Sequence, residues 1–380
     1  MIAQEQAGTD QRSPRVSGDA PGAGAALRAR TQTQGTHLVS GWRYGVLLGG
    51  LTVALLAVVL VGISVGAVSL PFREVWTVIV RHLTGGTAAT GDVDDRIIWE
   101  FRAPRVLLAA LVGAGLSVAG AALQTLVRNP LADPYVLGVS SGASLAAVAV
   151  ILLEVPLLAG VGVSLAAFVG AVVTMLAVVA LGQRAGRFSP PRLILAGVAV
   201  GALASSATSY LQIKADPQQL QGVLFWLLGT VAGATWSDLG VPGAVVVVGT
   251  AWLLVQARRL NALLMGEESA VALGVDVNRF RIELVLVSSA LTGAAVAVAG
   301  GIGFVGLMVP HVARMLVGPD HRRMLPTSAL IGATYLVLVD LLARTIQRPI
   351  ELPLGIFTAA IGAPFFIWLM RRNGRLAGST

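Results

Sequence analysis

One carboxylate stands out among the residues that could do chemistry in this chain. Asp340 lies deep inside a long apolar stretch, where an ionisable side chain is costly and is often functional, for example as a proton relay. Arg344 follows four residues later and would share a helix face with it, so a local ion pair is the simpler interpretation. We therefore favour an ion pair or a polar helix contact over proton coupling.

Two glycine motifs match catalytic signatures without the context that those signatures need. Residues 301–306 spell G-x-G-x-x-G, but no strand and no βαβ unit precede them. Residues 138–142 spell G-x-S-x-G, but a nucleophile elbow needs a strand–turn–helix and a histidine partner, and no visible pattern supplies either. We interpret both motifs as small residues that allow close helix packing.

The sequence also lacks the residue patterns that metal binding, thiol chemistry and nucleotide hydrolysis need. The chain has no cysteine, which excludes disulfides and cysteine-bound metals. His311 and His321 have no companion ligands, so no metal site is expected. Lys214 is the only lysine and does not lie in G-x-x-x-x-G-K-[ST], so the chain alone cannot be a Walker-type nucleotidase. We predict a protein that is not an enzyme and binds no cofactor.

The amino-acid composition indicates the class of protein that holds these residues. Hydrophobic residues make up 55% of the 380 and charged residues only 12%, with a mean hydropathy of +0.79; soluble domains carry about 25% charged residues. The net charge of +8 sits in short loops between apolar stretches, which is typical of membrane topology rather than of nucleic-acid binding. The predicted class is an all-α polytopic membrane protein.

A bilayer core about 30 Å thick requires about 20 apolar residues of helix. Ten stretches fit this length, the shortest being interrupted near Pro310. The predicted spans are residues 44–68, 103–127, 136–155, 158–182, 192–213, 238–257, 282–300, 302–318, 325–346 and 352–371.

The distribution of basic residues predicts the orientation. Most of the 27 basic residues lie on one side if both termini are cytoplasmic, and an acidic cluster at residues 92–100 then lies outside. Residues 1–40 are polar and aperiodic, so we expect a disordered cytoplasmic tail, followed by a membrane domain at 41–375 and a short tail at 376–380. Residues 111–120 align weakly with residues 291–300, which places Pro130 opposite Pro310 and suggests an inverted repeat.

Three blocks carry the strongest local signals. The first runs from Arg102 to Ser144 and contains RAPR and then NPLADPYVLGVSSGAS. Its turn residues cannot continue a lipid-facing helix, so they lie at a membrane face or line a protected cavity. These turn residues are Asn129, Pro130, Asp133 and Pro134.

The second block, MGEESAVALGVDVNRFR at residues 265–281, predicts a short amphipathic helix at about 266–280 in the cytoplasm. Glu267 and Glu268 suit the start of a helix and Gly274 suits its end. Ala270, Ala272 and Leu273 would form a small apolar face that needs a partner, unless this is an ordinary surface helix.

The third block, GIGFVGLMVPHVARMLVGPDHRR, spans residues 301–323. Two interpretations are equally open: a hydrogen-bonded cluster that fixes helix ends, or a joint that moves with the cytoplasmic helix. The polar and proline positions concerned are Pro310, His311, Arg314, Asp320, His321 and Arg322.

Together these blocks closely resemble the permease subunits of ABC importers for iron-siderophore, heme and cobalamin, the FecCD-like (type II) family. The resemblance covers about residues 45–375. It implies a ten-helix permease in the bacterial cytoplasmic membrane, paired with a second copy or a sister permease. It also implies two ATPase subunits that hold the ATP and Mg²⁺, and an extracytoplasmic substrate-binding protein.

The resemblance also implies roles for residues. The ATPase would bind the pattern formed by Gly266, Glu267, Glu268, Ala270, Leu273 and Gly274. Arg102, Arg105 and Arg344 would meet glutamates of the binding protein, and Arg348 extends this set by our own extrapolation. Interfacial anchoring is the alternative role for these arginines.

The translocation path is harder to assign. Small polar residues in the fifth span could line a cavity or permit close packing, and by resemblance a short helix at residues 220–229 would gate the channel. The candidates are Gly197, Gly201, Ser205, Ser206, Thr208, Phe225 and Trp226. We expect ATP-driven import of a ferric siderophore, with heme and cobalamin open. A gradient-driven secondary transporter that uses Asp340 is the competing class, and a passive channel is a third.

Overall fold

The computed structural model describes residues 40–66, 70–86, 93–153, 162–184, 187–188 and 190–377. Apart from Ser40, the predicted N-terminal tail lies outside these residues. The last helix continues to Ala377, two residues beyond the predicted boundary at residue 375.

Ten apolar helices match the ten predicted spans. Eight helices of the described residues are long and apolar enough to cross a membrane, and two shorter ones are also apolar. The long helices are α2 (Gly41–Ser64), α5 (Ala103–Val127), α7 (Val163–Gly182), α8 (Pro190–Ile213), α10 (Ser237–Val255), α13 (Val277–Ala299), α15 (His321–Ala343) and α16 (Leu354–Ala377). The shorter ones are α6 (Val139–Leu153) and α14 (Val305–Val317).

The remaining elements lie between these helices and mark two ends of the bundle. The α3 end carries α3 (Phe72–Leu83), α4 (Val93–Arg96), the π-helix η1 (Ile97–Arg102) and α9 (Pro217–Leu227). The α12 end carries the 3₁₀ helix η2 (Pro134–Leu137), the paired strands β1 (Gln183–Arg184) and β2 (Arg187–Phe188), α11 (Ala257–Leu264) and α12 (Glu267–Ala272).

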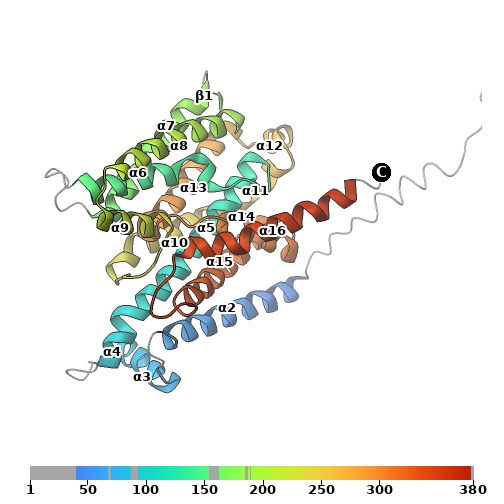
Figure 1. Ribbon diagram of the computed structural model, residues 1–380. Helices are drawn as coiled ribbons and strands as arrows, with labels where there is room; N and C mark the ends of the chain where they lie inside the picture. The colour runs from blue at the N-terminus through green and yellow to red at the C-terminus, as the bar shows by residue number, and fades with distance from the viewer. Residues whose placement is uncertain are drawn as a thin grey trace, which may run out of the picture. The chain divides into compact units, whose positions relative to one another are not determined.

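Helix α5 forms the centre of the bundle and packs against α10, α13, α14 and α15 (Figure 1). Its apolar segment is 78% buried, whereas that of α2 is only 11% buried. A Cβ at Gly120 would collide with the carbonyl of Gly306, and one at Gly113 with that of Gly332. Glycine therefore lets the backbones of α14 and α15 approach α5 closely.

Proline behaves differently in the two aligned segments. Pro130 lies in the turn that follows α5, whereas Pro310 lies inside an uninterrupted α14. The predicted break near Pro310 is therefore wrong, and the two prolines are not structural equivalents. Proline is tolerated inside a membrane helix when neighbouring groups satisfy the freed backbone.

Candidate functional site

A charged cluster lies at the α3 end, around Asp340. The carboxylate is fully buried and accepts from Arg105, with 2.8 Å between Arg105 Nη2 and Asp340 Oδ1. Arg344 Nε lies 3.4 Å from Asp340 Oδ2, which confirms the predicted i,i+4 pair. Arg105 Nη1 also donates to both carboxylate oxygens of Glu351, each at 2.9 Å. Asp340 is thus held by two guanidiniums, one of which the sequence did not indicate.

Three of the four predicted docking arginines lie together around a cavity of about 350 Å³. Arg102 and Arg344 are only 7% and 5% exposed, and they donate to the carbonyls of Ile63, Ser64 and Gly62 at the end of α2. In this conformation the side chains are committed to partners within the chain.

The fourth, Arg348, lies on the exposed segment that follows α15. It is thus the member of the set that solvent reaches most freely in this conformation. The docking role stays a prediction for all four arginines.

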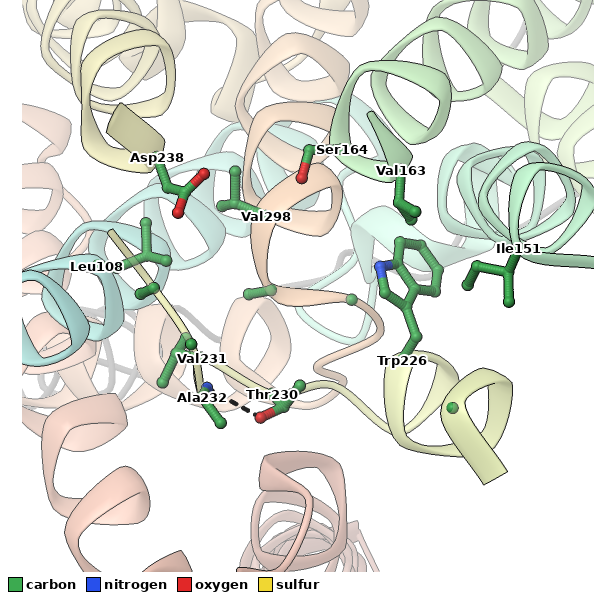
Figure 2. A pocket seen from close by; sticks show the side chains of 15 residues that line it. Leu108, Ile151, Val163, Ser164, Trp226, Thr230, Val231, Ala232, Asp238 and Val298 are labelled. Atoms are coloured by element: carbon green, nitrogen blue, oxygen red, sulfur yellow. Dashed lines mark hydrogen bonds between the residues drawn. The ribbon is translucent and has the colours of Figure 1, made fainter. Parts of the chain in front are cut away.

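A second cavity, of about 410 Å³, adjoins the first. Gly233 and Ala234 line both cavities. Figure 2 shows the indole of Trp226 pointing from α9 toward Val163 and Ile151, with Asp238 on the other side of the cavity. The wall is mostly apolar. Trp226, a predicted gate residue, therefore does line a cavity.

The loop after α9 is held by main-chain contacts that fix one edge of this cavity. Thr230 N donates to Ala299 O at 2.9 Å, and Leu354 N donates to Gly229 O at 2.8 Å. Gly229 has φ +79°, a left-handed conformation that favours glycine. The loop therefore joins the end of α13 to the start of α16.

Helix α8 separates the predicted path residues into two groups. Gly197, Gly201 and Thr208 face inward; a Cβ at Gly197 would collide with Val136 O, and Thr208 donates to Ala204 O. Ser205 and Ser206 lie on the exposed face. The first three residues therefore serve packing in this conformation.

The predicted cytoplasmic helix is shorter than expected. α12 ends at Ala272, and α13 begins at Val277 with Asp276 as its N-cap. Of the three residues predicted to form an exposed apolar face, Ala270 is fully buried, whereas Ala272 and Leu273 are exposed. Met265 and Val271 are exposed beside them. Gly274 has φ +78° directly after the helix, as its predicted role as a terminator requires.

One glutamate of α12 is fixed to the bundle. Arg281 Nη2 donates to Glu267 Oε2 at 2.8 Å, and the Arg281 side chain is only 6% exposed. Glu268 is exposed. Glu267 therefore ties α12 to α13, and Glu268 remains on the surface.

The turn between α5 and α6 is ordered by its own side chains. Leu131 N donates to Asn129 Oδ1 at 2.9 Å, and Tyr135 N donates to Asp133 Oδ1 at 2.8 Å. Ile302 N donates to Tyr135 Oη at 2.6 Å and so links this turn to the loop before α14. Burial raises the pKa of Asp133 to about 6, against a smaller lowering effect of the bond from Tyr135 N.

A hydrogen-bonded cluster fixes the start of α15. His321 contacts Thr125 Oγ1 and Asn261 Oδ1, both at 2.7 Å, and Asn261 Nδ2 donates to Asp320 Oδ1 at 2.7 Å. Burial acts to raise the pKa of Asp320, but the bonds from Asn261 and Arg322 N outweigh it and hold that pKa below its usual range. The structure thus contains a hydrogen-bonded cluster at this helix end, through partners Thr125 and Asn261 that no sequence motif marked.

The other residues of the third block make separate contacts. Arg314 Nη2 donates to Gln124 Oε1 at 3.0 Å, and Gln124 in turn donates to Gly306 O. His311 packs edge-on against Phe365. Among the described residues, no group of three His, Cys, Asp or Glu could hold a metal ion.

The long apolar helices define a polytopic membrane protein. The chain belongs to the FecCD transport family, whose model matches residues 54–372. It is thus the membrane-spanning permease subunit of an ABC transporter, and it is not itself catalytic.

Comparison with named proteins and a solved structure supports this assignment. The chain is 46% identical to a cobalamin import system permease of Halobacterium salinarum, over 80% of each chain. It is 42% identical to a hemin transport system permease of Yersinia pestis, over 86% of this chain and 96% of the relative. A solved inward-facing structure of a metal-chelate type ABC transporter matches with a TM-score of 0.75 at 34% identity, over 86% of this chain and 99% of the other.

Proposed function

We propose that this permease imports a ferric siderophore along a path between two permease copies, with heme and cobalamin as the alternative cargoes. The relatives are named for cobalamin, hemin and Fe(3+) dicitrate. All of these cargoes are bulky metal chelates, so a wide path with weak contacts suits them better than an ion-sized binding site.

The observation that carries the path is the uncovered face of α8. Leu195, Ala202, Ser206, Ser209 and Ile213 recur every three to seven residues along it and are all exposed. A helix wall that faces only lipid gains nothing from hydroxyl groups. A second copy, or a sister permease, facing this strip would enclose a cavity lined by small and hydroxyl side chains.

ATP hydrolysis would act on this path through α12. Val271, Leu273 and Met265 offer apolar surface to a groove on the ATPase, beside Glu268. Both termini would then lie in the cytoplasm, and the α3 end would face the substrate-binding protein. Arg348 would make the first contact there, and Arg105 would exchange Glu351 for a carboxylate of the binding protein.

The gradient-driven alternative does not hold. The chain is a member of an ABC permease family, and Asp340 is buried between two guanidiniums rather than facing a water-filled path.

The test is uptake into proteoliposomes that contain this permease, its ATPase and its binding protein. Labelled ferric siderophore, hemin and cobalamin are supplied separately, with or without ATP on the ATPase side. ATP-dependent uptake of ferric siderophore alone supports the proposal. Preferential uptake of hemin or cobalamin would show that this compound, and not a ferric siderophore, is the cargo. Uptake that does not depend on ATP would reject ATP-driven import.

A further inference from the structure

Helix α3 has a surface that the transport function does not use. Its twelve residues, FREVWTVIVRHL, divide into three faces. Val75 and Val78 are buried and attach the helix to the bundle. Arg73 and Thr77 are exposed and polar.

The third face is apolar and uncovered. Phe72, Trp76, Val80 and Leu83 recur every three or four residues, so they form one stripe along the helix. They are 56%, 52%, 37% and 75% exposed. If both the apolar and the polar face of this helix were in water, the apolar stripe would have nothing to pack against.

We infer that α3 is an interfacial helix, which lies along the lipid headgroups and inserts this stripe into the acyl boundary. A helix with one apolar and one polar free face is suited to lie in the plane of a membrane surface. Trp76 suits the headgroup level, and Arg73 can reach the phosphates from beside the stripe.

The lipid-facing side of α2 leads directly to this stripe. α2 exposes Val53, Leu56 and Val61 along its length, as a span at the edge of the bundle must. α3 begins eight residues after the last residue of α2 and packs against it (Figure 1). The stripe thus starts where the hydrocarbon region of the membrane ends.

The orientation of α3 is fixed by a polar and aromatic tie on its other side. Asp95 is buried and accepts from Arg81 at 3.3 Å and pairs with His82 at 2.9 Å. The His82 ring stacks on Trp99 of η1 at 4.2 Å. Because η1 continues into α5 through Arg102, the membrane contact of α3 would also set the position of the arginine cluster.

The described chain favours lipid over a protein partner on this stripe. α2 and α3 lie along one side of the bundle, whereas α8, with the strip assigned to the second copy, lies on the other (Figure 1). The stripe itself is wholly apolar, whereas a binding protein that docks through carboxylates would need charge there. This inference does not depend on which chelate is carried.

The absence of cysteine makes the test direct. Trp76→Cys, Leu83→Cys and, as the control on the polar face, Thr77→Cys are each spin-labelled in the full-length permease in nanodiscs. Power saturation then compares accessibility to oxygen, which partitions into lipid, and to a nickel chelate, which stays in water. We expect an oxygen-to-nickel ratio several-fold higher at positions 76 and 83 than at 77.

Two results would overturn the inference. Equally low oxygen-to-nickel ratios at all three positions would place the stripe in water. Low accessibility of positions 76 and 83 to both reagents, or its appearance only when the binding protein is added, would assign the stripe to a protein partner. Labels at two stripe positions guard against a single substitution that disturbs the helix.

Discussion

Asp340 could have a structural role in an ion pair or act as a proton relay, and its surroundings distinguish the two. Its carboxylate is fully buried, and the guanidiniums of Arg105 and Arg344 lie within ion-pair distance on two sides. Removing one partner of a buried ion pair costs about 3–5 kcal/mol, because the remaining charge has lost its compensation. The function of Asp340 is therefore to hold two cations in place at the α3 end.

We expect Asp340→Asn to lower the thermal unfolding midpoint strongly, by the equivalent of about 3–5 kcal/mol. Glu351→Gln is the matched control, since Glu351 also pairs with Arg105 but is 43% exposed, and it should cost less than about 1 kcal/mol. Thermal unfolding in detergent measures both. A stable Asp340→Asn protein with an altered pH profile of uptake would instead indicate a proton relay.

Asp133 predicts a pH effect on stability. Its folded-state pKa of about 6 lies above the ordinary 3.8, so its stabilising contribution is fully present below pH 3.8 and is lost as the pH rises through 6. Asp133→Asn keeps an oxygen that can accept from Tyr135 N but cannot ionise. We expect the unfolding midpoint to fall less between pH 5 and pH 7.5 in this variant than in the parent. An unchanged pH dependence would contradict the assignment.

Sequence spacing predicted the local contacts of these residues and missed the distant ones. The Asp340–Arg344 pair follows from helix periodicity. Arg105 is 235 residues from Asp340 and 246 from Glu351, and no local pattern connects residues so far apart. Asn261 was missed for the same reason, since it meets His321 only after α11 and α15 have packed together.

At the scale of elements, an ion pair joins α12 to the bundle beside the buried Ala270. Glu267 fixes α12 to Arg281 near the start of α13, and the other end of α13 contacts the loop that borders the larger cavity. α13 is thus a continuous helix between α12, the proposed ATPase contact, and the cavity edge. A charge-assisted hydrogen bond of this kind is worth about 1.5–3 kcal/mol, and partial exposure of Glu267 favours the lower end.

We therefore expect Glu267→Arg and Arg281→Glu each to reduce ATP-dependent uptake about tenfold, which corresponds to about 1.4 kcal/mol. ATP hydrolysis by the assembled complex should persist in the Arg281→Glu variant, because that substitution leaves the exposed surface of α12 unchanged. The double charge swap should restore uptake. Swapping Arg279 and Glu283, which pair at 3.1 Å on the same helix with side chains 80% and 28% exposed, serves as the control. Failure of the swap to restore uptake would reject the coupling role.

Helix limits were predicted well where apolar periodicity is long and less well where tertiary packing decides. The ten spans match the ten apolar helices. The inward orientation of Ala270 and the continuity of α14 through Pro310 depend on neighbours that compensate for one-dimensional signals. Composition alone could not reveal either of them.

For the whole molecule, two surfaces of similar exposure differ in chemistry. α2 exposes an apolar side at one edge of the bundle, and α8 exposes a side that includes Ser205, Ser206 and Ser209. Both sides are exposed in a single protomer. In the proposed function, this difference in polarity assigns one side to lipid and the other to the path between two copies.

This difference can be measured in the cysteine-free chain. Ser206→Cys and Val53→Cys place one thiol on each surface, and a membrane-impermeant, charged thiol reagent is added to the assembled transporter in proteoliposomes. We expect Ser206→Cys to react many times faster, because thiolate formation and reagent entry both require water, which a path supplies and acyl chains exclude. Substrate in the path should slow the reaction. Equal, slow labelling of both thiols would mean that α8 faces lipid, and the path would then have to run elsewhere in the bundle.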